Sequence, residues 1–244
     1  MSGGKLLQPE ELKQSLLSVG PERYHHKHPF HLLMHEGKLT RRQLQAWALN
    51  RYYYQSRIPV KDAIILSRST DADFRRAWLK RITDHDGVDH PGGIEKWIRL
   101  AETTGLDRAA VISERSILPG VRYAVDAYLH LVSQRSLLEA VASSLTEMFS
   151  RDLISLRLDA LRQHYPWLES GLMYFTARLT QAPEDATFAL DYVIRNAHTR
   201  AEQNLVIAAL RSKCDILWAQ LDAIHFAYVT PGWEPPASFT GTEA

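Results

Sequence analysis

The sequence is poor in cysteine and has no surplus of charge of either sign. Cys214 is the only cysteine among 244 residues, which excludes an intramolecular disulfide and a cysteine-rich metal site and fits a reducing compartment. Lysine and arginine (29) nearly balance aspartate and glutamate (28), so the chain as a whole does not attract nucleic acid or an anionic membrane. Any positive field that serves function must therefore be local.

Long hydrophobic runs are also missing. No apolar stretch approaches membrane-spanning length, and the first residues lack the apolar segment of a signal peptide. Runs of alternating β-branched residues bounded by turn residues are equally absent, which argues against a β-sheet. We therefore expect a cytoplasmic protein without strands, and its length suits a single domain.

What the sequence does contain is apolar residues at helical spacing along almost its whole length, which predicts an all-α fold of about seven helices around one core. We expect Gly20-Pro21 to stop the first helix and Pro59 to kink or break the one that Thr40 starts. Start and stop signals place helices at roughly 9–19, 40–64, 70–84, 93–104, 107–115, 119–128, 137–163, 171–179 and from 182 onward, with a break near 199. Residues 1–230 are expected to form one domain, and the Pro- and Gly-containing tail 231–244 is expected to pack loosely.

A dense polar cluster occupies residues 81–93, at the expected end of a helix. Arg81, Asp84 and His85 share one helical face, because residues three and four apart are neighbours on a helix. A histidine that titrates near neutral pH, beside a cation and an acid, is a ready proton-transfer group. His85 is therefore a candidate catalytic residue.

Other polar side chains also recur where a bundle should be apolar. Arg51 and Gln55 are four residues apart, as are Tyr174 and Arg178, and Arg157 stands between two leucines within a quarter-turn of Glu147 and Ile154. Each alone is as readily a solvated arginine, a tyrosine at the core rim or a capping histidine. If these faces converge, however, the cavity that they form suits a multiply anionic, planar ligand, because guanidinium groups bind carboxylates bidentately.

A metal site or a reactive thiol fits the sequence less well than a site for an anionic ligand. Di-iron sites in helical bundles use paired Glu-x-x-His motifs, and this chain has none. The spacing of His85 and His90, and of Asp191 and His198, supplies no convincing ligand pair. Cys214 lies in an apolar helical context, so we interpret it as a packed thiol. No catalytic metal is expected.

Several segments together carry a resemblance to a known family. They are Tyr24-His25 before Pro29-Phe30, and residues 50–59, 81–93, 143–147, 165–167 and 213–218. On these segments the chain, up to about Tyr228, resembles the pyrroloquinoline-quinone synthase C family of haem-oxygenase-like, TENA-related helical bundles. Because proteins of this fold perform different chemistry, fold alone does not decide function.

The resemblance implies a homodimeric oxidase that needs neither metal nor organic cofactor. Its substrates would be O₂ and a bicyclic quinone with carboxylates and an amino-acid side chain, which undergoes ring closure and eight-electron oxidation to pyrroloquinoline quinone with release of hydrogen peroxide. Two alternatives stay open: a di-iron oxidase on the same scaffold, and a non-catalytic carrier of the finished quinone.

The resemblance also implies site residues. His85 would transfer protons, and Tyr174 and Arg178 would form the oxygen pocket. The residues implied to bind or enclose the substrate are Tyr24, His25, Arg51, Gln55, Arg81, Tyr128, Glu147, Arg157 and Lys213. The chain departs from some relatives at Ile154, where they have a histidine. Residues 195–204 also match poorly, which leaves Arg200 without a role and His198 as a conceivable replacement for the missing imidazole.

Overall fold

The computed structural model describes residues 4–241, with the backbone alone for residues 180 and 182–185. Within these residues the fold is all-helical, with twelve α-helices, three 3-10 helices and no β-strand. The predicted fold class is therefore confirmed, but the expected number of about seven helices is wrong. Short helical segments near the N-terminus and between residues 137 and 149 account for most of the difference.

The elements follow one another in a single run along the chain. They are α1 (Pro9–Leu17), α2 (Val19–Arg23), η1 (His25–Lys27), α3 (Pro29–His35), α4 (Arg41–Ser67), α5 (Ala72–Asp86), α6 (Gly93–Thr103), α7 (Arg108–Ile112), α8 (Pro119–Gln134), α9 (Leu137–Ser143), η2 (Ser144–Phe149), α10 (Ser150–His164), η3 (Pro166–Gly171), α11 (Met173–Asn196) and α12 (Arg200–Tyr228).

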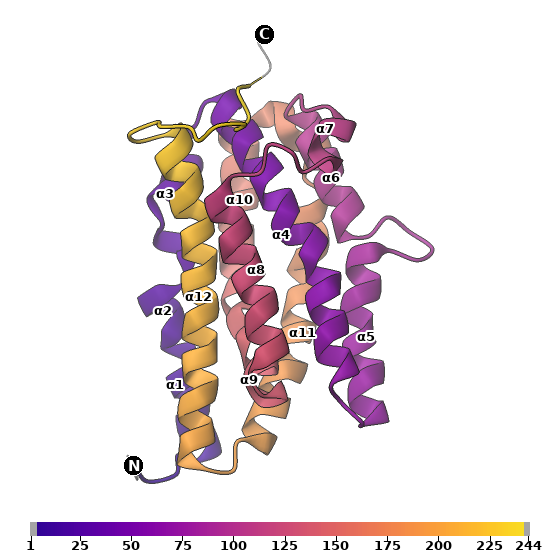
Figure 1. The fold of residues 1–244 in the computed structure, drawn as a ribbon, viewed down its shortest axis with the longest axis vertical. Helices are drawn as coiled ribbons and strands as arrows, with labels where there is room; N and C mark the ends of the chain where they lie inside the picture. Colours follow the sequence, from indigo (N-terminus) through magenta and orange to yellow (C-terminus); the bar gives the residue numbers. More distant parts are fainter. Residues whose placement is uncertain (1–3, 242–244) are drawn as a thin grey trace.

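The longest helices run roughly side by side as a bundle (Figure 1). Helix α4 packs against α5, α6 and α8, and α12 packs against α8 and α9, so that segments far apart in sequence surround a common interior. No helix in the described part of the chain is both long and apolar enough to span a membrane.

An aromatic cluster fills one half of that interior. The ring of Trp47 lies 5.2 Å from that of Trp97 and parallel to that of Phe175, and all three side chains are almost fully buried. The Trp97 indole N–H donates to the Ala48 carbonyl at 2.9 Å, which satisfies its one polar atom. Truncating such a side chain to alanine typically costs about 3–5 kcal/mol, so this cluster gives the cavity beside it a rigid wall.

Helix α4 begins where its capping residues predict. The Thr40 hydroxyl accepts from the Gln43 amide N–H, and the Gln43 side chain accepts from the Thr40 N–H at 2.8 Å, which is a complete capping box. The helix then continues without a break past Pro59 to Ser67, so the expected break is wrong. Continuity matters because both Arg51 and Lys61 depend on this one helix for their positions.

Gly20-Pro21 does not stop a helix either, since both residues lie inside α2. A Cβ atom on Gly20 would lie 2.6 Å from the Phe149 ring. The glycine therefore serves close packing rather than chain termination, and the short α2 replaces the expected end of the first helix.

The helix boundaries predicted for residues 137–163 and around residue 180 are wrong. Residues 137–163 are divided into α9, the 3-10 helix η2 and α10, and the tighter η2 carries Glu147. The two helices expected on either side of residue 180 are instead one, α11, although the side chains of 182–185 lie outside the described structure. The predicted break near Thr199 is confirmed, because Thr199 caps the start of α12.

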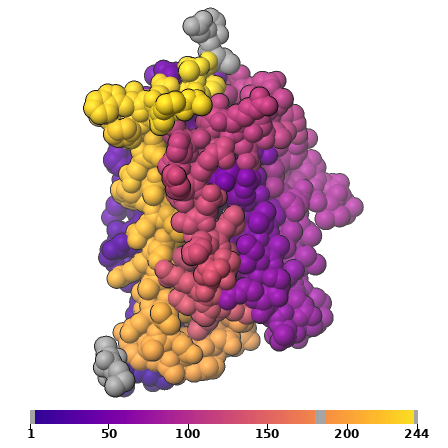
Figure 2. All heavy atoms as spheres, in the orientation of Figure 1, coloured from indigo at the N-terminus to yellow at the C-terminus, as the bar shows by residue number. Residues whose placement is uncertain are grey.

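The segment after α12 lies across one end of the bundle, as Figure 2 shows in yellow. Arg42 forms an ion pair with Glu234 at 2.5 Å, and Phe239 packs on the hydrophobic core. These contacts hold parts of the tail, but none of residues 231–241 is buried, so loose packing stays a prediction. Residues 242–244 lie outside the described structure.

Candidate active site

A polar cavity of about 100 Å³ lies inside the bundle, several times the ~10–15 Å³ that one water molecule requires. Ten of the twelve predicted site residues line it: Tyr24, His25, Arg51, Gln55, His85, Tyr128, Glu147, Arg157, Tyr174 and Arg178. The remaining two, Arg81 and Lys213, are buried and each contacts a residue that lines the cavity. The faces that seemed misplaced in the sequence do converge.

Two helices present matching pairs of side chains to this cavity. Helix α4 supplies Arg51 and Gln55, and α11 supplies Tyr174 and Arg178, each pair four residues apart and therefore on one face. The Tyr174 hydroxyl donates to the Gln55 amide oxygen at 3.1 Å, which links the two helices across the cavity.

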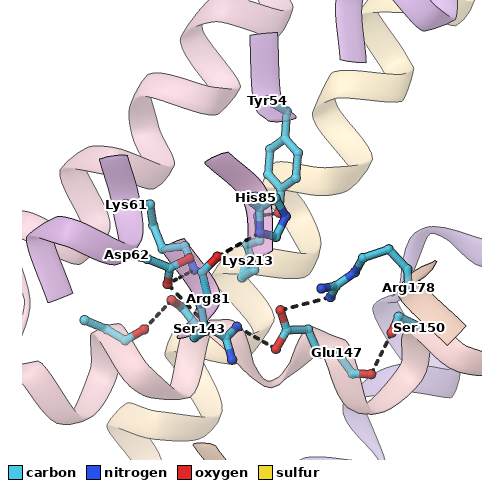
Figure 3. Close-up of polar contacts among 11 residues, drawn as sticks. Tyr54, Lys61, Asp62, Arg81, His85, Ser143, Glu147, Ser150, Arg178 and Lys213 are labelled. Carbon is cyan, nitrogen blue, oxygen red and sulfur yellow. Dashed lines mark hydrogen bonds and ion pairs between the residues drawn. The ribbon is translucent and has the colours of Figure 1, made fainter. Parts of the chain in front are cut away.

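One group of cations is matched by acids (Figure 3). Arg81 binds the Glu147 carboxylate at 2.6 Å, and Arg178 lies 3.5 Å from its other oxygen. Burial raises the pKa of Glu147, but the guanidiniums of Arg81 and Arg178 outweigh it and the net pKa is lowered. Glu147 is therefore ionised, and it holds two guanidinium groups at the cavity wall.

Lys61 and Asp62 extend this group, and the sequence did not single them out. The Lys61 ammonium binds Asp62 at 2.5 Å, and the Arg81 Nε lies 3.4 Å from the same carboxylate oxygen. Both residues are almost fully buried. An adjacent Lys-Asp pair just before the apolar run 63–66 was the available signal, since charges rarely stand at such positions unless paired.

A second group of cations has no acid. In the part of the chain that the structure describes, Arg51, Arg157 and Lys213 form no ion pair with a carboxylate. Arg51 stacks on the Tyr54 ring at 4.0 Å, and the Lys213 ammonium donates to the Tyr54 hydroxyl at 2.8 Å. Neutral and aromatic partners hold these cations in place but leave their charge available to an anion.

Burial and mutual repulsion lower the pKa values of two of these cations, Lys213 and Arg157. Burial, followed by the charge of Arg51, lowers the pKa of Lys213 well below its usual value, although its ammonium lies 3.5 Å from the centre of the Tyr128 ring. Burial also lowers the pKa of Arg157 to about 10, with a further contribution from Arg51. An anion bound between these groups would relieve the repulsion among them.

His85 lies in the last turn of α5, two residues before Gly87, where the chain turns with φ +83°. Its Nδ1 is 3.0 Å from the Arg81 carbonyl oxygen, which can only accept, so Nδ1 carries the proton and Nε2 has the free lone pair. Burial and the charge of Arg178 lower the pKa of His85 to about 4. The expected titration near neutral pH is wrong, but a neutral imidazole is the form that accepts a proton.

The departure at Ile154 is visible in the cavity, whose wall this side chain joins. His198 does not replace the imidazole that some relatives have here, because it is exposed beside Thr199 at the start of α12. Arg200 lies against Gly4, also away from the cavity. The idea of a substitute imidazole from this helix is therefore wrong.

The ligand chemistry of the cavity does not match a metal site. Among the residues described, no three His, Cys, Asp or Glu side chains are grouped so that they could hold a metal ion. The carboxylates present, Glu147 and Asp62, are already bound to arginine and lysine. The cavity is instead built to receive negative charge.

Comparison with known proteins assigns this chain to a family. The sequence profile described as the TENA/THI-4/PQQC family matches residues 14–223. The chain belongs to this family. A pyrroloquinoline-quinone synthase of Acidiphilium cryptum is 57% identical over 96% of both chains, and one of Granulibacter bethesdensis is 53% identical over 96% of this chain and 93% of its own. The resemblance inferred from the sequence is confirmed, and these names agree with the expectation of an enzyme.

Solved structures support the fold alone. A haem-oxygenase-like domain from Shewanella denitrificans superposes with a TM-score of 0.79 at 13% identity, covering 97% of this chain and 100% of its own. A TenA homologue from Pseudomonas syringae gives a TM-score of 0.73 at 13% identity, covering 91% and 96%. The predicted haem-oxygenase-like architecture is confirmed.

Proposed function

We propose that this chain catalyses the final step of pyrroloquinoline quinone biosynthesis. The reaction is ring closure and eight-electron oxidation of a carboxylated amino-quinone by O₂, with hydrogen peroxide as a product and with neither metal nor organic cofactor. The names of relatives at 53–57% identity support the pathway. The observation that carries the proposal is a group of three cations that form no ion pair with a carboxylate in the described part of the chain: Arg51 and Arg157 in the wall of the cavity, and Lys213 buried beside it.

These cations fit the carboxylates of such a substrate. A guanidinium group binds a carboxylate through two parallel hydrogen bonds, and each charge-assisted bond contributes about 1.5–3 kcal/mol. The Arg157 Nε is buried and has no hydrogen-bond partner in the structure, so it is an open donor for the ligand. Binding the remote carboxylates here would fix the quinone ring relative to His85.

His85 supplies the base in this scheme. After the substrate amine adds to the quinone and closes the ring, oxidation requires loss of protons from the new ring, and the unprotonated Nε2 of His85 can accept one. The deprotonated, electron-rich quinol can then reduce O₂ without a redox cofactor. Proton return from the His85 imidazolium would complete the reduction of oxygen to peroxide.

Tyr174 and Arg178 are proposed to hold the oxygen. Apolar side chains of Trp97, Phe175 and Ile154 line the same cavity, and an apolar surface favours a dissolved gas over water. The Arg178 guanidinium would stabilise the negative charge that develops on oxygen as electrons arrive. Glu147 keeps this guanidinium in place.

An anaerobic experiment tests the proposal. The protein is mixed with the bicyclic intermediate without oxygen, oxygen is then admitted, and quinone absorbance, O₂ uptake and peroxide are followed. We expect oxygen uptake, peroxide and product only after oxygen enters. Binding without O₂ consumption would instead identify a carrier, and turnover that requires near-stoichiometric iron in the purified protein would identify a di-iron oxidase.

His85→Asn is the matched variant for this experiment. The asparagine amide can replace Nδ1 as donor to the Arg81 carbonyl, but it has no basic nitrogen at the position of Nε2. We expect the rate of product formation to fall by roughly 10²–10⁴-fold with the fold intact. Turnover at the wild-type rate would rule out His85 as the base. The homodimer remains a prediction, which sedimentation velocity would check.

A further inference from the structure

A cavity histidine, His25, contacts a second buried histidine, His31, which has no role so far. His25 lines the cavity from η1, and His31, in the first turn of α3, lies against it. Both are at most 5% exposed. The Nδ1 atoms of the two rings are 3.1 Å apart, and the His31 Nδ1 is also 2.9 Å from the His25 carbonyl oxygen.

The positions of the protons follow from these contacts. A carbonyl oxygen can only accept, so the His31 Nδ1 carries a hydrogen and donates it. The His25 Nδ1 faces that same N–H and must be the unprotonated, accepting atom. The remaining hydrogen of a neutral His25 is then on Nε2, which makes no hydrogen bond to the described part of the protein.

Arg157 completes the arrangement. Its Nη2 lies 2.9 Å from the His31 Nε2 and 3.1 Å from its Nδ1, so the guanidinium is held against the ring. Burial and this positive charge lower the pKa of His31 well below its usual value, and burial and Arg51 do the same for His25. Both imidazoles are therefore neutral, and only their tautomers remain to be fixed.

We infer that His31 is a positioning residue that fixes the Nε2–H tautomer of His25, so that His25 presents a hydrogen-bond donor to the cavity. His31 does not touch the ligand itself. A donor at this point suits a carboxylate or quinone oxygen, whereas the other tautomer would present a lone pair and repel it. This consequence for binding rests on the proposed function, but the tautomer itself does not.

Three variants of His31 separate the two contacts. In His31→Asn the amide nitrogen can take the place of Nδ1 and still donate to His25, while the contact of Nε2 with Arg157 is lost. In His31→Gln the amide takes the place of Nε2, so the contact with Arg157 is kept and the donor to His25 is lost. His31→Leu removes both, and His35→Leu, one turn further along α3 and outside the cavity wall, is the control.

The readout is the tautomer of His25 in ligand-free protein, measured from long-range ¹H–¹⁵N correlations of ¹⁵N-histidine-labelled samples and assigned with His25→Gln. We expect the Nε2–H form in the wild type, in His31→Asn and in His35→Leu. A mixture or the Nδ1–H form is expected in His31→Gln and His31→Leu. A His25 that carries its proton on Nδ1 in the wild type, or a tautomer unchanged in His31→Leu, would overturn the inference.

Affinity for pyrroloquinoline quinone gives a second, independent measurement. Losing one oriented neutral donor should raise the dissociation constant about tenfold in His31→Leu, and less in His31→Asn. If the tautomer changes as expected but no variant, nor the wild type, binds the quinone, the tautomer assignment stands and the proposed function fails. If the wild type binds tightly and His31→Leu binds equally well with its tautomer unchanged, the inference fails and the proposed function stands.

Discussion

At the scale of single residues, burial governs the chemistry of this protein. His85 shows this best, because a side chain that was expected from the sequence to titrate near neutral pH is 4% exposed and lies near the positive charge of Arg178. The charged form is penalised by both effects. The consequence is a neutral imidazole over the whole physiological pH range, and it can be tested through stability as well as through activity.

Stability should depend on pH through His85. Its pKa is lowered to about 4 in the folded state, against 6.5 unfolded, so the unfolded chain binds more protons between these values. The free energy of unfolding should therefore fall as the pH falls from about 6.5 towards 4, by up to about 3 kcal/mol from this one group. Urea unfolding at pH 7 and pH 4.5 measures the effect.

His85→Asn is the control for that measurement, since it cannot take up the proton. Other buried histidines remain in both proteins and their contributions cancel in the difference. The variant should lose less stability on acidification than the wild type. Equal losses in the two proteins would show that His85 titrates at its ordinary pKa.

Cys214 should be chemically silent in the folded protein. It is fully buried, and burial raises the pKa of its thiol to about 12, which leaves almost no thiolate at neutral pH. A thiol reagent such as dithionitrobenzoate should react with less than a tenth of a thiol per chain in native protein at pH 8, and with one in guanidinium. Rapid reaction of native protein would contradict the burial of this residue.

At the scale of elements, the end of α5 is the segment on which the position of His85 depends. Gly87 ends the helix with φ +83° and ψ 155°, a region that essentially only glycine adopts. A Cβ atom there would lie 2.5 Å from the His90 carbonyl oxygen and 2.7 Å from the Gly92 nitrogen. The loop is therefore closed too tightly for any side chain.

Gly87→Ala should lower the free energy of unfolding by about 1–3 kcal/mol and reduce activity further by displacing His85. Gly232→Ala is the matched control. Its φ is +81°, but a Cβ atom there would meet nothing nearer than 3.9 Å and it lies far from the cavity in sequence and in contacts. Thermal unfolding and turnover are measured for both variants. Equal losses of stability and activity in the two would contradict the crowding at Gly87.

At the scale of the whole molecule, the bundle concentrates positive charge in an overall neutral chain. The formal net charge is only +1, yet Arg51, Arg157 and Lys213 gather in or beside the cavity wall, and none of them is paired with a carboxylate in the described part of the chain. Burial and the charge of Arg51 disfavour the protonated form of Lys213 and lower its pKa. A bound anion would favour the protonated form of Lys213 and raise its pKa, so ligand binding and proton binding should be linked.

Binding of pyrroloquinoline quinone should therefore take up protons from the buffer at any pH where Lys213 is partly unprotonated in the ligand-free protein, so the measurement is made at several pH values from about 7 to 9. Calorimetry in phosphate and in Tris should give different binding enthalpies, because the two buffers differ in their enthalpies of ionisation. Lys213→Met should reduce the difference between the buffers as well as the affinity. Identical enthalpies in both buffers for the wild type would contradict the linkage.

The sequence by itself determined the all-helical class, since apolar residues at helical spacing and capping residues such as Thr40 and Thr199 act locally. It also drew attention to part of the cavity wall, because Arg51, Gln55 and Arg157 occupy positions where an apolar face was due, whereas residues such as Tyr24 and Tyr128 were singled out through the family resemblance. It failed where long-range contacts override local signals: Phe149 packs against Gly20 inside a helix, and η2 interrupts the expected helix at 144–149.

Only the tertiary structure decided which charges are matched and which are free. Arg81 and Arg157 look alike in the sequence, but Arg81 meets Glu147 and Asp62, while Arg157 meets a neutral histidine. Those partners are more than fifteen residues away in every case, so no local pattern specifies them. The pKa of His85 was undetermined for the same reason, because desolvation is a property of the packed bundle and not of any segment of the chain.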